Sequence, residues 1–196
     1  KNQKLISNCG YFQDYNSKLN KVSKSTAAHS TLNLDNSSST TFLSKQGGRS
    51  FLKNNVKITS TKIVSEKKFW SIQASHDGYQ KQLGITHNRK IDINLEKLEI
   101  LGIDKLLKKN SNKTIPFDVR FHFVPGIKLT KTQDNKSVLI EMENSGWKFF
   151  TNSGSISIES GIYLGNKNRT EQNQNICISG LCDAEDQIIE WKFFRI

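Results

Sequence analysis

The chain has 196 residues with 35% hydrophobic content, enough for one domain with a substantial core. It carries 29 Lys and Arg against 18 Asp and Glu, a net charge of +11. No apolar run approaches the roughly 20 residues of a membrane-spanning helix, and no signal sequence opens the chain. A strand-like segment at 4–6 follows Lys1 almost at once, which predicts a chain cut from something longer.

The first 40 residues are the least strand-like part and contain the run 24–32, in which small residues flank His29. Small neighbours allow another backbone or a ligand to approach the imidazole, and nearby hydroxyls can fix its tautomer. This pattern predicts a functional histidine just ahead of a short strand at 32–35. The alternative is a hydrogen-bonded strand residue with no chemical role.

Alternation of apolar and polar residues dominates the rest of the chain. It is sharpest at 117–123, where Phe and Val occupy one face and Asp118, Arg120 and His122 the other. The pattern predicts one antiparallel β-sandwich domain of two sheets over 1–196, with little helix. Only 102–107 has a helix-like spacing, and it could equally continue a strand. The predicted strands are 56–59, 62–64, 69–74, 85–95, 97–100, 117–123, 138–142, 146–150, 155–159, 176–179 and 188–193, with turns at 46–48, 125–126, 134–135 and 153–154.

Polar residues within this scaffold offer weaker candidates. His76 and Tyr79 lie in the segment Ser-His-Asp-Gly-Tyr and could face a sugar, although a tight turn explains the segment equally well. His87 and Arg89 share one face of a strand, as Arg120 and His122 do on another. Such pairs could bind carboxylates or sulfates, and a plain exposed polar face is the alternative.

The cysteines and tryptophans are interpreted as structural. Cys9 stands alone, and one pair at Cys177 and Cys182 does not define a zinc site. We expect free buried thiols, with a Cys177–Cys182 disulfide as the alternative in an oxidising compartment. The tryptophans are expected in the core because each lies on an alternating strand: Trp70, Trp147 and Trp191.

Several motifs, taken in order, resemble the C-terminal half of the heparinase II/III family of polysaccharide lyases. They are Ser-Asn-Cys-Gly at 7–10, Ser-Thr-Ala-Ala-His-Ser-Thr at 25–31, Ser-His-Asp-Gly-Tyr at 75–79, His-Asn-Arg-Lys at 87–90, Arg-Phe-His-Phe-Val-Pro-Gly at 120–126 and Ile-Glu-Trp-Lys-Phe at 189–193. The resemblance implies a large, supersandwich-like β-sandwich that follows an α/α toroid. Acidic polysaccharide would be cleaved by β-elimination in the cleft between them, so the chain's own N-terminal toroid is an expected partner.

The resemblance also implies site residues. Tyr15, or less well Tyr11, matches the interval of a catalytic tyrosine, and His29 matches a histidine at the site. Other catalytic groups would lie on the toroid and in a histidine motif just before Lys1. His29 is also implied as a ligand of a structural zinc, but Asn8 replaces the expected Asp and lacks its anionic oxygen. The alternative is a His29 hydrogen-bonded to Asn8 or to the histidine motif.

Two functions follow. The first is the sandwich domain of a bacterial lyase for a uronate-containing glycan such as a glycosaminoglycan or alginate, inactive without its toroid and periplasmic or secreted. The second is a non-catalytic basic β-sandwich that binds anionic polysaccharide or another polyanion. The charge also has a compositional explanation, since Lys, Asn and Ile are enriched together and the lysines are scattered. No specific nucleic-acid signature is present, so only weak DNA binding is expected.

Overall fold

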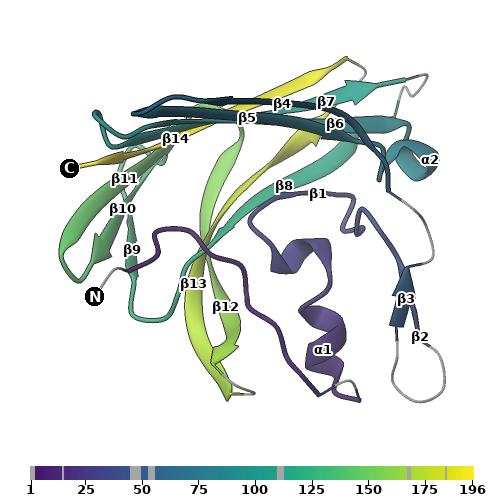
Figure 1. Ribbon diagram of the computed structural model, residues 1–196, viewed down its shortest axis with the longest axis horizontal. Helices are drawn as coiled ribbons and strands as arrows, with labels where there is room; N and C mark the ends of the chain where they lie inside the picture. Colours follow the sequence, from purple (N-terminus) through teal and green to yellow (C-terminus); the bar gives the residue numbers. More distant parts are fainter. Residues whose placement is uncertain are drawn as a thin grey trace.

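The computed structural model describes residues 3–14, 16–44, 50–52, 56–109, 113–166, 169–183 and 185–196. Within them, two antiparallel sheets pack face to face (Figure 1), as the alternation predicts. The larger sheet has the order β4-β5-β6-β7-β14-β11-β10-β9, the smaller β1-β8-β13-β12, and β2 and β3 form a separate hairpin. The strands are β1 (Leu32–Leu34), β2 (Phe42–Ser44), β3 (Ser50–Leu52), β4 (Ile58–Ser65), β5 (Phe69–His76), β6 (Ile85–Asn94), β7 (Glu99–Lys108), β8 (Ile115–His122), β9 (Lys128–Lys131), β10 (Ser137–Met142), β11 (Ser145–Thr151), β12 (Ser155–Asn166), β13 (Arg169–Cys182) and β14 (Gln187–Arg195).

Aromatic side chains from both sheets fill the centre of the sandwich. Phe121 of the smaller sheet lies 4.7 Å from Trp191 and 5.1 Å from Phe193 of the larger sheet, measured between ring centroids. Gly102, the register partner of Trp191, leaves room for the indole, since a Cβ there would lie 2.0 Å from Cζ2 of the ring. Cross-strand neighbours thus fix both the register and the core packing.

Apart from β1, the N-terminal 40 residues are mostly irregular and pack against the smaller sheet and its edge. They contain helix α1 (Lys18–Val22), capped by the Ser17 side chain, and the 3-10 helix η1 (Thr26–Ala28). Cys9 and Ala28 pack on Leu164 of β12 in a second apolar cluster. The strand predicted at 4–6 is absent: Leu5 and Ile6 pack on the main core, and only Ser7 forms a bridge, to His122.

The segment 102–107 is strand, not helix, and lies inside β7. Its pairing with both β6 and β14 satisfies the backbone on each side, which outweighs the local spacing. The structure adds β9 and helix α2 (Gln80–Leu83), which ends at Gly84 in the left-handed conformation. The predicted turns at 125–126, 134–135 and 153–154 lie between strands, and the one at 46–48 falls outside the described residues.

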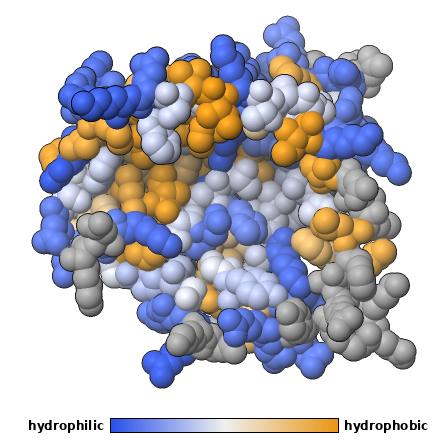
Figure 2. Space-filling model, viewed as in Figure 1, coloured by the Kyte–Doolittle hydropathy of each residue, from blue (hydrophilic) through white to orange (hydrophobic). Residues whose placement is uncertain are grey.

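The inner face of the larger sheet extends beyond the smaller sheet. The register aligns Trp70 with Ile93, Ile100 and the buried Phe193, so all four point to the same side. Trp70 is nevertheless 48% exposed, so the core prediction is wrong for this residue, because it lies on the uncovered part of the face near the sheet edge. Trp191 is buried as expected and Trp147 is partly buried. Ile63 and Ile72 are exposed on the same part, and Figure 2 shows apolar surface beneath the larger sheet.

The three cysteines are buried free thiols. Burial raises the pKa of Cys177 to about 12, which keeps this thiol protonated and unreactive at neutral pH. The described part of the chain contains no helix long and apolar enough to cross a membrane.

Candidate active site

His29 lies at the end of η1, at the boundary between the N-terminal segment and the smaller sheet. Its backbone N–H donates to the Thr26 carbonyl at 3.0 Å, closing the 3-10 turn. Ala28 is buried in the apolar cluster, whereas the His29 side chain is partly exposed. The small residues therefore let the turn approach β12 closely while leaving an imidazole at the surface.

Ser30 anchors this turn through four hydrogen bonds. Its backbone N–H donates to Asn8 Oδ1 at 3.0 Å, and its hydroxyl donates to the Ser7 carbonyl at 2.5 Å and accepts from His122 N at 2.8 Å. Its carbonyl accepts from Arg89 Nη1 at 2.7 Å. Elements far apart in the sequence thereby hold the residue next to His29, which anchors the backbone that carries the imidazole.

His122 approaches the same turn from β8. Its Nε2 bonds to the Ala27 carbonyl at 3.0 Å, so Nε2 carries the proton, and the buried Nδ1 has no hydrogen-bond partner among the described residues. Burial lowers the pKa of His122, with Arg120 and His29 adding to the effect. Burial also lowers the pKa of His29, opposed by a hydrogen bond with the Ser23 backbone. Both imidazoles are therefore neutral at neutral pH and able to accept a proton.

Beneath the turn, Asp104 of β7 is completely buried and accepts hydrogen bonds from three side chains. His87 Nε2 bonds to Oδ1 at 2.6 Å, and Trp191 Nε1 donates to Oδ2 at 2.8 Å. Arg89 donates twice, from Nε to Oδ1 at 2.6 Å and from Nη2 to Oδ2 at 2.9 Å. Burial alone would raise the pKa of Asp104, but the Arg89 charge and the His87 hydrogen bond hold it well below its usual range.

The network continues to His76 of β5. Its Nδ1 accepts from Gly78 N at 3.1 Å, so its Nε2 carries the proton and donates to His87 Nδ1 at 3.1 Å. His87 can then donate Nε2–H to Asp104, which satisfies both rings in their neutral form. Burial, with the nearby His87, lowers the pKa of His76 to about 4. His76, His87 and Arg89 thus form a positioning network behind the His29 turn.

The prediction that His87 and Arg89 lie on an exposed polar face is wrong, because both side chains point between the sheets. His87 is buried, and the Arg89 guanidinium is occupied by Asp104 and Ser30. Tyr79 is also fully buried; its hydroxyl donates to the Leu32 carbonyl at 3.1 Å, and burial raises its pKa to about 12. A side chain without exposed surface cannot contact a glycan, so Tyr79 has a structural role.

The second polar pair is also occupied within the protein. Arg120 makes a bidentate ion pair with Glu159, at 2.9 and 3.2 Å, and a further contact with Asp118. His122 is only 5% exposed because η1 covers it. Neither residue presents an unpaired cation to solvent, so the smaller sheet is not the open carboxylate-binding face that alternation allows.

The zinc site does not fit the residues present. The amide oxygen of Asn8 accepts a hydrogen bond from the Ser30 backbone N–H and not from His29. An amide is also a poor zinc ligand. The described part of the chain has no group of three His, Cys, Asp or Glu side chains placed to hold an ion. Tyr15 lies outside the described residues, while Tyr11 is exposed near Lys24.

Sequence reasoning missed Asp104, the centre of the buried network. The available signal was its alternation with Gly102 and Leu106, which places a carboxylate on the apolar face of a strand. A buried carboxylate requires cationic or hydrogen-bonding partners, so this position could have predicted that His87 and Arg89 point inward. The role of Trp191 as a donor to Asp104 had no comparable signal.

Comparisons with known proteins identify the family and the fold. Residues 1–192 match the family described as "Heparinase II/III-like, C-terminal", and the chain belongs to that family. The heparan sulfate lyase HepC from Pedobacter heparinus superposes with a TM-score of 0.71 at 15% identity, covering 91% of this chain and 25% of HepC. A heparinase III with methylated lysines gives a TM-score of 0.73 at 14% identity, covering 100% of this chain and 28% of the other. These similarities establish the sandwich fold.

A curated relative is FtsZ-localized protein C of Caulobacter vibrioides, which is 26% identical over 129 residues, or 61% of this chain and 22% of the relative. The chain therefore spans only a quarter or so of the length of the proteins it matches.

Proposed function

We propose that the chain is the C-terminal sandwich domain of a polysaccharide lyase that cleaves a uronate-containing glycan, with His29 at the border of the active site. The observation that carries the proposal is the His29 turn of a heparinase II/III-like chain, in which four hydrogen bonds hold Ser30 beside a partly exposed, neutral imidazole. HepC, which shares the fold, is named as a heparan sulfate lyase, so a glycosaminoglycan is the preferred substrate class.

The reaction requires three groups. A partner for the uronate carboxylate makes the C5 proton acidic, a base removes that proton, and an acid protonates the departing glycosidic oxygen. The C5–H electron pair becomes the new C4–C5 double bond as the C4–O bond breaks, so no oxidant or reductant is needed. In this proposal His29 accepts or relays the proton, and Tyr15 serves as the second proton-transfer group. Arg89 positions the His29 turn through its bond to the Ser30 carbonyl, and His76 supports Arg89 through His87 and Asp104.

The remaining groups belong to an N-terminal toroid in this proposal, and proximity of all of them makes the elimination feasible. The 196-residue chain alone is therefore expected to be inactive. A periplasmic or secreted location is proposed for the whole protein because its polymeric substrate lies outside the cytoplasm.

The test uses the whole protein, including any sequence its gene encodes ahead of Lys1. Given heparan sulfate, it should produce the ultraviolet absorbance of an unsaturated uronate. His29→Ala should abolish most of that signal while leaving the thermal unfolding midpoint close to that of the parent. Full activity in His29→Ala would remove His29 from the site, and inactivity of the parent on every acidic glycan would refute the lyase.

The net charge of +11 supports a second candidate, a non-catalytic β-sandwich that binds polyanions. The curated relative is named for localisation at FtsZ, which makes a binding role worth separate testing. This candidate predicts glycan binding by the whole protein without any unsaturated product.

A further inference from the structure

A pocket of about 250 Å³ lies between α1, η1 and β2, beside the His29 turn. It combines side chains of three kinds: ammonium groups, an aromatic ring and hydroxyls. Its lining includes Lys21, Lys24, Phe42, Ser25, Ser38 and Thr41, and none of the described lining residues carries a carboxylate. A small cavity with this composition favours an anionic ligand that also has hydroxyl groups.

The aromatic rings hold one of the two cations in place. Lys24 Nζ lies 6.0 Å from the ring centroid of Tyr11 and 5.9 Å from that of Phe42. Cation–π attraction of this kind orients the ammonium group. Both rings keep exposed surface, which provides apolar planes next to the cation. Lys21, in the last turn of α1, is the second cation at the pocket, and its carbonyl accepts a hydrogen bond from Lys24 N at 3.2 Å.

The pocket wall and the His29 turn form one hydrogen-bonded unit. Thr26 N donates to Ser38 Oγ at 3.1 Å, and Ser39 N donates to Thr26 Oγ1 at 2.9 Å. Thr26 begins η1, whose last residue precedes His29. The connection between β1 and β2 is therefore clamped to the turn that carries the imidazole, and a ligand held in the pocket has a fixed position relative to His29.

We propose that this pocket binds an anionic sugar unit, whose carboxylate or sulfate group contacts Lys21 and Lys24 while the sugar ring lies against Phe42 and Tyr11. The inference deepens the proposed function, since it makes the pocket a subsite for the same glycan. Its own content is a binding site, which the isolated chain can display without any catalytic activity.

The test is calorimetric titration of the 196-residue chain at about 0.15 M salt, where long-range charge effects are screened. Three oligosaccharides of equal length serve as probes: sulfated heparan sulfate, its unsulfated uronate-containing counterpart, and a neutral glucan. Binding of the unsulfated probe would identify the carboxylate as the recognised group, and binding of the sulfated probe alone would identify the sulfate. The neutral glucan should not bind, and equal binding of all three would overturn the proposal.

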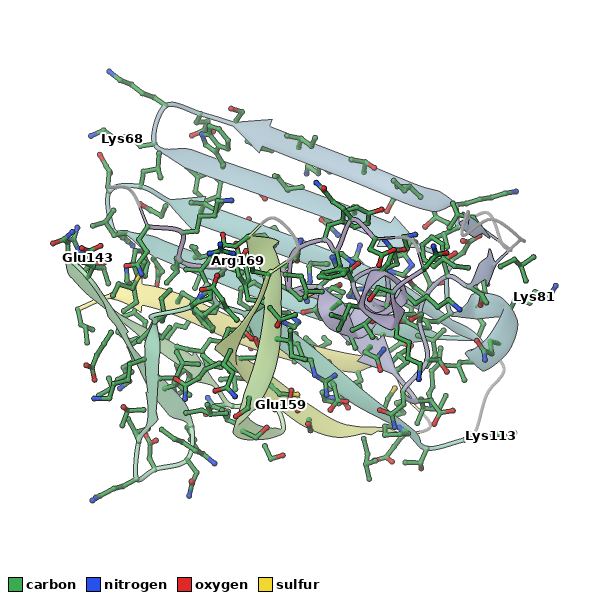
Figure 3. The ribbon with its side chains drawn as sticks, turned by 90° about the horizontal axis from the view of Figure 1, so that it is seen from below. Lys68, Lys81, Lys113, Glu143, Glu159 and Arg169 are labelled. Atoms are coloured by element: carbon green, nitrogen blue, oxygen red, sulfur yellow. The ribbon has the colours of Figure 1, made fainter. Side chains whose placement is uncertain are left out.

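A double variant tests the lysines against a control of equal charge. Lys21→Gln/Lys24→Gln should weaken binding about tenfold or more, since each lost charge-assisted hydrogen bond removes a large share of a modest affinity. The control Lys62→Gln/Lys67→Gln removes the same charge from the β4–β5 hairpin. Lys68 marks the turn of this hairpin in Figure 3, at the end of the molecule opposite Lys81 and Lys113. The control should change affinity less than threefold. Equal losses in the two variants would mean general attraction to a basic protein and would overturn the proposal.

The aromatic contact has its own pair of variants. Phe42→Leu keeps apolar bulk but removes the ring and should lower affinity several-fold, whereas Phe42→Tyr should retain it. Thermal unfolding midpoints near the parent value would confirm that both variants are folded. Parent-like binding by Phe42→Leu would exclude the ring from the site. Glycan binding at this pocket with no unsaturated product from the whole protein would refute the lyase proposal alone.

Discussion

Asp104 lies at the centre of the buried network, because its two oxygens accept one hydrogen bond from His87 and two from Arg89. A buried ion pair contributes little when complete, but removing one partner leaves an uncompensated charge in the interior. The same carboxylate also accepts a hydrogen bond from the Trp191 indole, so the polar network is joined to the aromatic core.

Asp104→Asn should lower the free energy of unfolding by about 3 kcal/mol, because Arg89 loses its buried counter-charge. Urea denaturation of the 196-residue chain is the measurement. Glu96→Gln is the control: its ion pair with Lys68 is well exposed and should contribute less than about 1 kcal/mol. Similar effects of the two substitutions would contradict the importance of the network.

His76 predicts a pH dependence of stability. Its pKa is about 4 in the folded chain, against a usual 6.5, so between these values the unfolded chain binds more protons. Stability is therefore complete above about pH 6.5 and declines as the pH falls towards 4. The expected loss between pH 7 and pH 5 is about 1–2 kcal/mol, reduced from the full linkage value because the ring is partly exposed. The lowered pKa values of His29 and His122 act in the same direction.

Urea denaturation at the two pH values measures this effect, and His76→Gln should remove the share that belongs to His76. An unchanged pH dependence in that variant would assign the effect to other groups.

At the scale of elements, the larger sheet depends on the close approach of β7 and β14. The Trp191 ring lies so close to Gly102 that a residue with a Cβ atom does not fit at this position. Conversely, the exposed part of the inner face shows that a strand can carry core-type residues without a partner layer, as Trp70 does on β5. Alternation reports which residues share a face, but the extent of the opposing sheet decides which of them are buried.

Gly102→Ala should destabilise the chain by about 2–4 kcal/mol, since the added methyl group must displace Trp191 and with it the bond to Asp104. Gly146→Ala is a matched control on β11 in the same sheet. A Cβ there would meet the flexible Ile196 side chain at 3.1 Å and the Ile196 backbone oxygen at an ordinary 3.7 Å, so the change should cost less than about 1 kcal/mol. Thermal unfolding of both variants tests the difference, and equal stability of the two would contradict the packing argument.

For the whole molecule, the net charge of +11 could attract any polyanion, whereas a glycan-binding pocket would recognise one class of polymer. If charge alone acted, duplex DNA and heparan sulfate of similar charge would bind with similar affinity and salt dependence. We expect the glycan to bind more tightly at equal salt, because the pocket of Lys21, Lys24 and Phe42 offers hydroxyl and ring contacts as well as charge. Competition between the two polymers measures this preference, and tighter DNA binding would favour the second candidate function.

Local sequence is enough to predict the two-sheet sandwich and most strand positions, and it marks the segment around His29 as a candidate site. These follow from local information: side chains alternate along strands, and small residues permit close approach. It also located His76, His87 and Arg89 as members of notable motifs. It could not show that they meet Asp104, since that depends on the register of β5, β6 and β7.

The tertiary structure determines which residues of each strand face are covered and which polar side chains meet between the sheets. It turned His87, Arg89 and Tyr79 inward, left Trp70 uncovered, and brought Ser30 into contact with residues from three distant segments. The physical reason is that burial and hydrogen-bond partners come from strand pairing and sheet coverage, which join residues far apart in the chain. The spacing of residues within one strand does not show which other strands or segments pack over that strand.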